Sequence, residues 1–505
     1  MESEPHFLLV IDQGTTSTRA ILFDSAFRPL ASHAIEFRQI YPANGWVEHD
    51  PEEIWQTVLA CCRVVTKGVP PAEIAAIGIA NQRETTMVWE RASGHAIHNA
   101  IVWQDRRTAD RCAELLSGGF EHLVSAHTGL VIDPYFSATK LEWLLDHIPD
   151  ARRRAAGGEL AFGTIDSWII FRMTGGRVHA TDVTNASRTL LLDLSARTWD
   201  GEMLDLFRVP HEILPEIRNS VDDFGETRED LFGARIPIRG VAGDQQAASF
   251  GQACFAPGDV KATYGTGCFA LANAGAKIPV SHNRLLATAA CSVSGRAEYA
   301  IEGSIFVAGG VVQWLRDALG IIQTAAEVET LAGRARDVTG LYFVPAFTGL
   351  GAPYWDSAAR GAIMGLTRDA GAAEIAQAAL DSVCYQTRDL LEAMTLDLAD
   401  AGLDAPRVLK IDGGMAANNG FCQRLADLSG REVVRPAMTE TTALGAAYLA
   451  ALGSGLLRDL DHVRTTWSFE RSFEPRLKSV VRDDLYDGWK GAVSRVRSGF
   501  RASGK

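Results

Sequence analysis

The sequence predicts an α/β protein made of two related halves. Short apolar segments of strand type repeatedly end in polar turns rich in Gly and Thr, and segments with helical spacing of apolar residues follow several of them. The strand-and-turn pattern of residues 7–23 starts again at residues 260–270. Such a restart is typical of an internal duplication. We therefore expect one α/β domain in residues 1–250 and a second in residues 251–505.

The first half opens with a predicted hairpin. Phe7–Ile11 is an apolar run typical of a buried strand, a polar turn follows, and Arg19–Phe23 resumes the strand pattern. Ile74–Ala80 predicts another strand, which runs directly into the polar cluster Asn81–Thr86. Later in this half, helical patterns occur at Thr139–His147 and, after Ala161–Asp166, at Ser167–Met173.

The second half repeats this opening. Val260–Ala270 combines strand residues with a Gly- and Thr-rich turn, and Val408–Gly414 is a strand that ends in Asp-Gly-Gly. Asn418–Arg431 follows with helical periodicity, and the small residues of Thr441–Ala451 predict a closely packed helix. In both halves the strands lead into polar loops at their ends, where open α/β sheets place their ligands.

Composition excludes several classes of protein. The 505 residues are 47% hydrophobic and 22% charged, which is ordinary for a globular chain, and the formal net charge is −13. This charge disfavours nucleic acid and anionic membrane surfaces as partners. The eight cysteines form no CxxC pair, so we expect reduced, mostly buried thiols in a cytoplasmic protein. Phe7–Ile11 is too short to cross a bilayer, and nothing before it has the pattern of a signal peptide, so no membrane anchor is expected.

The turn after the first strand has the composition of a phosphate-binding turn. Gly14 permits a tight bend, and hydroxyls beside the backbone N–H groups come from Thr15, Thr16 and Ser17. Asp12 at the strand end could hold Mg²⁺ through water. The alternative is a polar hairpin whose hydroxyls satisfy their own turn. A second turn of this type, Gly265–Gly267, follows a strand in the other half.

A third Gly-rich turn suggests contacts to a nucleotide. The glycines of Asp412–Gly414 let the backbone approach a flat ligand closely, and Asn418 can both donate and accept hydrogen bonds. Gly309 and Gln313 could complete such a site. The alternative is an ordinary strand-to-helix turn with Asn418 at the helix start.

Two further segments suggest a site for a small hydroxylated substrate. Arg83 and Glu84 place a donor beside an acceptor at a strand end, as a polyol requires, although such pairs are also common on surfaces. Asp244 follows Gly243 after an apolar run and could take a proton from a substrate hydroxyl, or could cap a helix. Aromatic walls for this pocket could come from Trp103 and Tyr135, which could equally be core residues.

Longer segments resemble a known family. The motifs are Asn81–Thr86, Tyr135–His147, Tyr342–Asp356 and Gly361–Leu366 with Glu374–Asp381 after it. In order and spacing, from Asp12 to about Ala451, the chain resembles the FGGY carbohydrate kinases, and within them the members that act on glycerol.

The resemblance implies a fold and an activity. The fold is two actin-like, ribonuclease-H-like ATPase domains around a central cleft. The N-terminal domain would carry the glycerol site and the phosphate turn, and the C-terminal domain the nucleotide site. The activity is phosphorylation of glycerol by ATP with Mg²⁺ between two closing domains, giving sn-glycerol 3-phosphate as the entry step of glycerol catabolism. A homodimer or homotetramer is implied as well.

Site residues carry over position by position. The positions matching the family's phosphate turn are Thr15, Thr16, Ser17 and Arg19, and those matching its other nucleotide contacts are Thr266, Gly309, Gln313, Gly414 and Asn418. The positions matching its glycerol contacts are Arg83, Glu84, Tyr135, Asp244 and Gln245, with Trp103 and Phe269 as apolar walls. Asp244 also matches the catalytic base.

The chain departs from the family in one regulatory segment, and two other functions stay open. Glu229–Arg235 is shorter and poorer in Gly than the loop that binds fructose 1,6-bisphosphate in some bacterial members, and it lacks the histidine that is phosphorylated in others. One alternative function is a kinase for another small polyol or sugar. The other is an actin-like or Hsp70-like ATPase, which would need a partner-binding surface.

Overall fold

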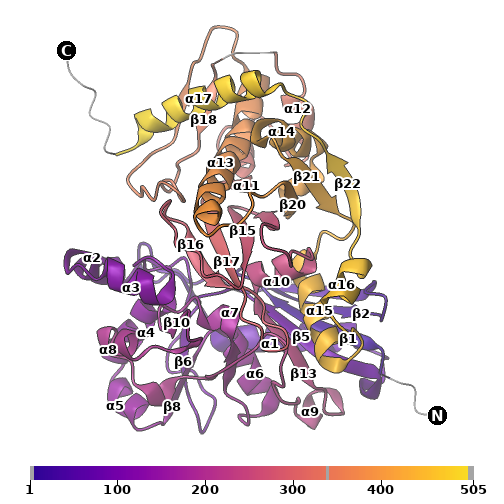
Figure 1. Ribbon diagram of the computed structural model, residues 1–505. Helices are drawn as coiled ribbons and strands as arrows, with labels where there is room; N and C mark the ends of the chain where they lie inside the picture. Colours follow the sequence, from indigo (N-terminus) through magenta and orange to yellow (C-terminus); the bar gives the residue numbers. More distant parts are fainter. Residues whose placement is uncertain (1–4, 337–339, 499–505) are drawn as a thin grey trace. The chain divides into compact units, whose positions relative to one another are not determined.

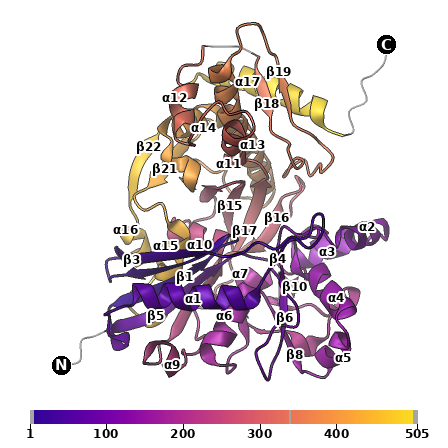
Figure 2. The ribbon, with the colours of Figure 1, turned by 180° about the vertical axis from the view of Figure 1, so that it is seen from behind.

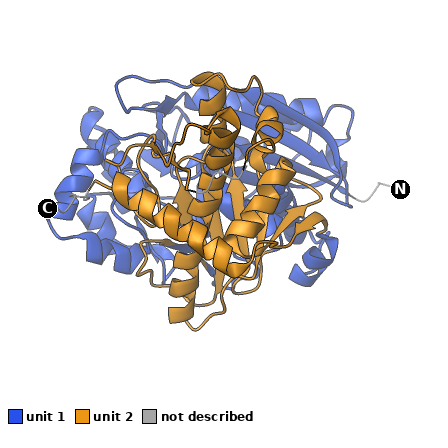
Figure 3. Cartoon of the chain, turned by 90° about the horizontal axis from the view of Figure 1, so that it is seen from above, with its two compact units in different colours: residues 1–253, 287–299, 441–467 blue, residues 254–286, 300–440, 468–505 orange. Residues whose placement is uncertain are grey.

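The computed structural model describes residues 5–336 and 340–498 and confirms the α/β class (Figure 1). The chain forms two compact units (Figure 3). The first consists of the residues up to Ala253 with 287–299 and 441–467, and the second of 254–286, 300–440 and the residues from Ser468 onward. Two segments beyond residue 250 thus belong to the first unit, whereas the sequence predicts a single division near that residue.

The first unit is built on a five-stranded sheet in the order β13-β5-β1-β2-β3. Its strands are β1 (Phe7–Gln13), β2 (Ser17–Phe23), β3 (Pro29–Glu36), β5 (Ile74–Asn81) and β13 (Ile238–Gly243). β1, β2 and β3 form an antiparallel meander, whereas β5 runs parallel to both β1 and β13. The predicted hairpin and the strand at 74–80 are confirmed.

The second unit repeats this strand arrangement. Its sheet includes the order β17-β15-β14-β20-β21-β22. The strands are β14 (Val260–Tyr264), β15 (Cys268–Gly275), β17 (Tyr299–Ile305), β20 (Val408–Asp412), β21 (Glu432–Pro436) and β22 (Phe469–Phe473). β14 and β15 form the hairpin, and β20 runs parallel to β14 and β21. In each sheet the first hairpin strand has a parallel neighbour on its other side, as an internal duplication predicts.

The predicted helices are present, together with others that were not predicted. In the first unit α1 (Pro51–Val65) packs against β2 and β3 (Figure 2). The helices predicted at 139–147 and 167–173 are α4 (Ser137–His147) and α6 (Ile165–Thr174). In the second unit α14 (Asn419–Ser429) packs against α13 (Ala372–Asp400).

Small residues bring α15 (Thr441–Ser454) into contact with the first unit's sheet and with α10 (Asp244–Gly251). A Cβ atom at Gly78 would overlap the carbonyl of Ala446, and one at Gly445 would overlap the carbonyl of Ala247. Only glycine permits backbones to approach this closely. This is the close packing predicted for 441–451, and it explains why a segment so late in the chain belongs to the first unit.

Two further expectations can be compared with the structure. All eight cysteines are buried and none forms a disulfide. Among the described residues, no helix combines the length and the apolar character that a membrane span requires.

Candidate active site

Arg83 is the centre of the first group of predicted site residues, all in the first unit. Its guanidinium lies 3.3 Å from the carboxylate of Asp244 and 3.8 Å from that of Glu84 (Nε to Oδ1 and Oε1). It also donates to Gln246 Oε1 at 3.2 Å and to the Tyr135 hydroxyl at 3.5 Å. One buried cation thus joins three of the residues singled out in the sequence.

Sheet topology explains this meeting. β5 and β13 are parallel neighbours, with Asn81 opposite Gly243 in register. The carboxyl ends of adjacent parallel strands lie at the same edge of a sheet. Arg83 and Asp244 follow these two strands, so they lie side by side at that edge. Gly243 is needed at this point, since a Cβ there would lie 2.7 Å from the Arg83 side chain.

Asp244 is the first residue of α10, and Gly243 occupies the N-cap position. The carboxylate accepts hydrogen bonds from the backbone N–H of Gln245 at 2.8 Å and from the Gln245 amide at 3.2 Å. Its side chain is 33% exposed, whereas that of Arg83 is 2% exposed. Asp244 is therefore the accessible carboxylate of the group, paired with a buried cation but open to a ligand.

Glu84 has a left-handed backbone, with φ of +59°, which is rare for a residue other than Gly, Asn or Asp. Two hydroxyls hold its carbonyl: Thr86 Oγ1 donates at 2.9 Å and Ser137 Oγ at 3.1 Å. The carboxylate accepts from Nε of the fully buried Arg188 at 2.7 Å. Glu84 is thus fixed at both its backbone and its side chain, as strained residues at ligand sites commonly are.

Tyr135 and Trp103 form an aromatic wall. Their ring centroids are 5.6 Å apart in an edge-to-face arrangement. Lys140 donates to the Tyr135 carbonyl at 2.5 Å. Lys140 is fully buried, and this burial lowers its pKa to about 8. Both aromatic rings are only half-buried, so they remain available to a ligand.

The predicted phosphate turn joins β1 to β2. Gly14 N donates to Ser17 O at 3.0 Å, Thr16 is exposed, and Asp12 lies opposite Arg19 in the hairpin register. The turn contacts the aromatic wall, because Trp103 Nε1 donates to Thr15 Oγ1 at 2.9 Å. The phosphate turn and the Arg83 group are therefore linked within one unit.

The second unit contains a separate cavity of about 500 Å³. All five predicted nucleotide contacts of this half line it: Thr266, Gly309, Gln313, Gly414 and Asn418. Apolar side chains such as Val312, Leu380 and Met415 line it as well. A mostly apolar cavity with a few convergent polar groups is typical of a site for a flat organic ligand.

Close backbone contacts shape this cavity. A Cβ at Gly309 would lie 2.6 Å from the Gly265 carbonyl, and Gly413, with φ of +86°, would place one 2.5 Å from the Tyr264 carbonyl. Asn418 caps α14 by accepting from Phe421 N at 2.8 Å. The helix-start interpretation of Asn418 is thus confirmed, and the same residue also lines the cavity.

One predicted wall residue belongs to the other unit. Phe269 lies on β15 opposite Thr263, is half-buried and belongs to the second unit. Its role stays a prediction.

Several residues of the site were not predicted from the sequence. Arg188, Gln246 and Lys140 contact predicted residues, yet Arg188 is 104 positions from Glu84, and Gln246 is 163 from Arg83. In the second cavity Arg316 and Glu329 were likewise missed. The spacing of polar residues could have suggested Gln246 alone, since it follows Asp244 and Gln245 directly.

Known proteins match the chain along most of its length. The N-terminal domain of the FGGY family of carbohydrate kinases matches residues 7–251, and its C-terminal domain matches residues 260–454. "Glycerol kinase 1" of Pseudomonas aeruginosa is 57% identical over 98% of this chain and 99% of its own, and a glycerol kinase of Ectopseudomonas mendocina is 56% identical over 97% and 99%. The solved structure of Plasmodium falciparum glycerol kinase with ADP is 34% identical, with a TM-score of 0.91 over 97% of this chain and 98% of that one. The chain belongs to the FGGY family of carbohydrate kinases.

Proposed function

We propose that this protein transfers the γ-phosphoryl group of ATP to glycerol and forms sn-glycerol 3-phosphate. The observation that supports this most is the group of Arg83, Glu84, Tyr135 and Asp244 at one sheet edge. Relatives that are glycerol kinases share more than half of their residues with nearly the whole chain.

The group around Arg83 suits a triol. Every hydroxyl of glycerol both donates and accepts, so its site must offer both functions. Arg83 supplies a donor fork, Glu84 an acceptor and Tyr135 a hydroxyl that does either, while Trp103 and Tyr135 cover the carbon backbone. Held in this way, one terminal hydroxyl lies at Asp244.

Asp244 orients that hydroxyl and accepts its proton. As the new O–P bond forms, the bond from the γ-phosphorus to the bridging oxygen of ADP breaks, and ADP leaves with the electron pair. The transition state of phosphoryl transfer is loose, so positioning and charge neutralisation supply most of the acceleration. The guanidinium of Arg83 lies 3.3 Å from the Asp244 carboxylate and holds it in place beside the substrate hydroxyl.

Two sets of residues are the proposed nucleotide contacts. In the first unit Thr15, Thr16, Ser17 and Arg19 offer donors to phosphate groups. In the second unit the cavity lined by Thr266, Gly309, Gln313, Gly414 and Asn418 suits adenosine. Asp12 would hold Mg²⁺ through water. The described residues include one group of three metal-type ligands, His127, Asp193 and Asp200, and Asp12 is not in it. A single carboxylate fits Mg²⁺, which keeps its waters and binds phosphate oxygens. When bound, the ion neutralises charge on the triphosphate.

The cellular setting follows the same proposal. The enzyme acts in the cytoplasm on glycerol and ATP, in keeping with eight buried thiols that form no disulfide. That it forms a homodimer or homotetramer stays a prediction.

A coupled ADP assay tests the activity. With Mg²⁺, ADP formation should require an acceptor, and kcat/KM should be highest for glycerol among glycerol, dihydroxyacetone, erythritol, xylulose and ribulose. ADP formation at full rate without any acceptor would identify a mechanical ATPase instead. A higher kcat/KM for a pentulose would identify a kinase for another sugar.

Gly243→Ala should misplace Arg83. The added Cβ would lie 2.7 Å from Arg83 Cγ and Cδ, so the guanidinium must move away from Asp244. Since displacements near 1 Å can cost up to about a hundredfold in rate, we expect kcat/KM for glycerol to fall at least about tenfold.

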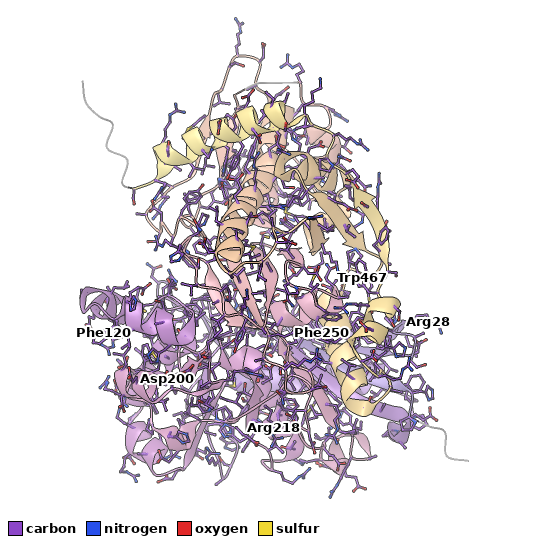
Figure 4. The ribbon with its side chains drawn as sticks, viewed as in Figure 1. Arg28, Phe120, Asp200, Arg218, Phe250 and Trp467 are labelled. Carbon is purple, nitrogen blue, oxygen red and sulfur yellow. The ribbon has the colours of Figure 1, made fainter. Side chains whose placement is uncertain are left out.

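Gly201→Ala is the matched control for Gly243→Ala. Like Gly243, Gly201 lies at the start of a helix: it is the first residue of α8 (Gly201–Leu206) and directly follows the N-cap Asp200, which is labelled in Figure 4. A Cβ at Gly201 would meet no atom within 4 Å. The control should keep its kcat/KM, and equal kinetics for the two variants would rule out the proposed contact between Gly243 and Arg83.

A further inference from the structure

The Trp103 side chain makes a hydrogen bond to the phosphate turn. Its indole Nε1 donates to Thr15 Oγ1 at 2.9 Å across 88 positions of the chain. Trp103 follows β7 (Ala100–Ile101), whereas Thr15 lies in the bend between β1 and β2. Under the proposed function the first residue faces the acceptor and the second faces the nucleotide. This hydrogen bond therefore joins two subsites that bind different ligands.

A second line of hydrogen bonds runs between the same two places. The backbone N–H of Trp103 donates to Thr85 Oγ1 at 3.3 Å, and Thr85 Oγ1 donates to Gln82 Oε1 at 2.9 Å. Gln82 Nε2 then donates to Gln13 Oε1 and to the Gly14 carbonyl, both at 3.1 Å. The side chains of Gln13, Gln82 and Thr85 are buried.

Gln39 makes a third contact, to the backbone of the phosphate turn. Gln39 Nε2 donates to the Thr15 carbonyl at 3.0 Å, and Gln39 Oε1 lies 2.8 Å from His49 Nε2. His49 is buried, and this burial lowers its pKa to about 4, so the ring is neutral near pH 7. A neutral ring that donates through Nε2 suits the carbonyl oxygen of Gln39. Gln39 thus holds the backbone of Thr15, and Trp103 determines the orientation of the Thr15 hydroxyl.

The chemistry of the Trp103 contact determines its effect. An indole N–H can only donate, so it occupies an acceptor lone pair of the Thr15 hydroxyl. The hydroxyl hydrogen must then point to another partner, which has to be an acceptor. A phosphate oxygen is such an acceptor, whereas without Trp103 the hydroxyl could rotate and offer a lone pair instead.

We propose that Trp103 is a positioning residue for the nucleotide: through Thr15 it holds a hydroxyl as a donor toward the phosphates, and so couples acceptor binding to phosphate binding. This inference rests on the proposed function. An acceptor seated against the Trp103 ring would restrict the indole and with it the hydroxyl. Glycerol should therefore tighten nucleotide binding, and by linkage the nucleotide should tighten glycerol binding by the same factor.

Trp103→Phe tests the coupling. Phenylalanine keeps an aromatic face for the acceptor but removes the N–H. The affinity for a non-hydrolysable ATP analogue with Mg²⁺ is measured by calorimetry with and without saturating glycerol. We expect the gain in affinity caused by glycerol to fall about three- to tenfold, the size of one hydrogen bond, while KM for ATP rises by a similar factor.

Two substitutions at Thr15 separate positioning from packing. Thr15→Val keeps the shape but removes the hydroxyl, and should reproduce the effect of Trp103→Phe. The double variant should show no further loss beyond either single one, because both remove the same interaction. Thr15→Ser retains a hydroxyl and should restore most of the coupling.

Trp199→Phe is the matched control. Its indole also makes one hydrogen bond, Nε1 to the Pro215 carbonyl at 2.8 Å, outside the proposed site in the same unit. It should leave KM for ATP and the coupling unchanged. Additive effects of Trp103→Phe and Thr15→Val, or unaltered coupling in Trp103→Phe, would overturn the inference. Failure of the proposed function is distinct, since the wild-type protein would then form no ADP with glycerol.

Discussion

Replacement of Asp244 with Asn should lower kcat for glycerol phosphorylation at least a hundredfold while glycerol still binds. The hydroxyl of glycerol is a very weak acid, so its proton must leave as the O–P bond forms, and a positioned base typically contributes 10²–10⁴-fold. Asn keeps the size and can still accept the Gln245 N–H bond, now 2.8 Å long, but it cannot take a proton. The measurement is kcat from the coupled ADP assay, beside glycerol affinity from calorimetry.

Asp193→Asn is the control for loss of a carboxylate as such. Asp193 is half-buried in the first unit and accepts two backbone N–H groups, from Ser195 at 2.8 Å and Ala196 at 2.9 Å. Its variant should keep kcat. A residual activity above about a tenth of wild type in Asp244→Asn, where even the low end of general-base catalysis is a hundredfold, would falsify the role of Asp244.

Arg83→Ala should lower kcat/KM for glycerol by at least tenfold, and by at least about a hundredfold if two charge-assisted hydrogen bonds are lost. Such bonds are worth about 1.5–3 kcal/mol each. The guanidinium also touches Glu84, Asp244, Gln246 and Tyr135, so its removal frees the groups that should hold the triol. Steady-state kinetics with glycerol as the varied substrate measures the loss.

Two variants separate recognition from folding. Arg83→Lys keeps the charge but not the planar fork, and should recover only part of kcat/KM. Arg388→Ala removes another largely buried arginine, which pairs with Glu392 and Asp483 at 2.8 Å in the second unit. It should lower Tm but not kcat/KM of the folded enzyme. Near-native glycerol kinetics in Arg83→Ala would remove this residue from the proposed site.

Local sequence patterns were sufficient for most of the fold. β5 is a continuous apolar run that ends in a polar residue, and β20 leads into Asp412 and two glycines, so both strands could be recognised. For the same reason the turns at 12–17 and 265–267 could be recognised before any contact was known. Arg83 and Asp244 could each be singled out because each follows an apolar run, whereas the parallel pairing of their two strands became known only from the structure.

Other features depend on contacts that no local pattern contains. Arg188 fixes Glu84 from 104 positions away, and Lys140 holds Tyr135 through a backbone carbonyl that any residue would supply. The left-handed backbone conformation of Glu84 could not be predicted either, because Gly and Asn are the residues that usually adopt it. The place of 441–467 in the first unit follows from packing between α10 and α15, which links segments about 200 positions apart.

That packing has a consequence for synthesis on the ribosome. α10, which begins with Asp244, and the sheet beneath it are translated early, yet the helix that covers them, α15, ends only at Ser454. Domains usually fold as units while the chain is made from its N-terminus. In this protein the core of the first unit stays incomplete until about nine-tenths of the chain has been translated. The face of its sheet that α15 covers is therefore exposed while the strands of the second unit are being made.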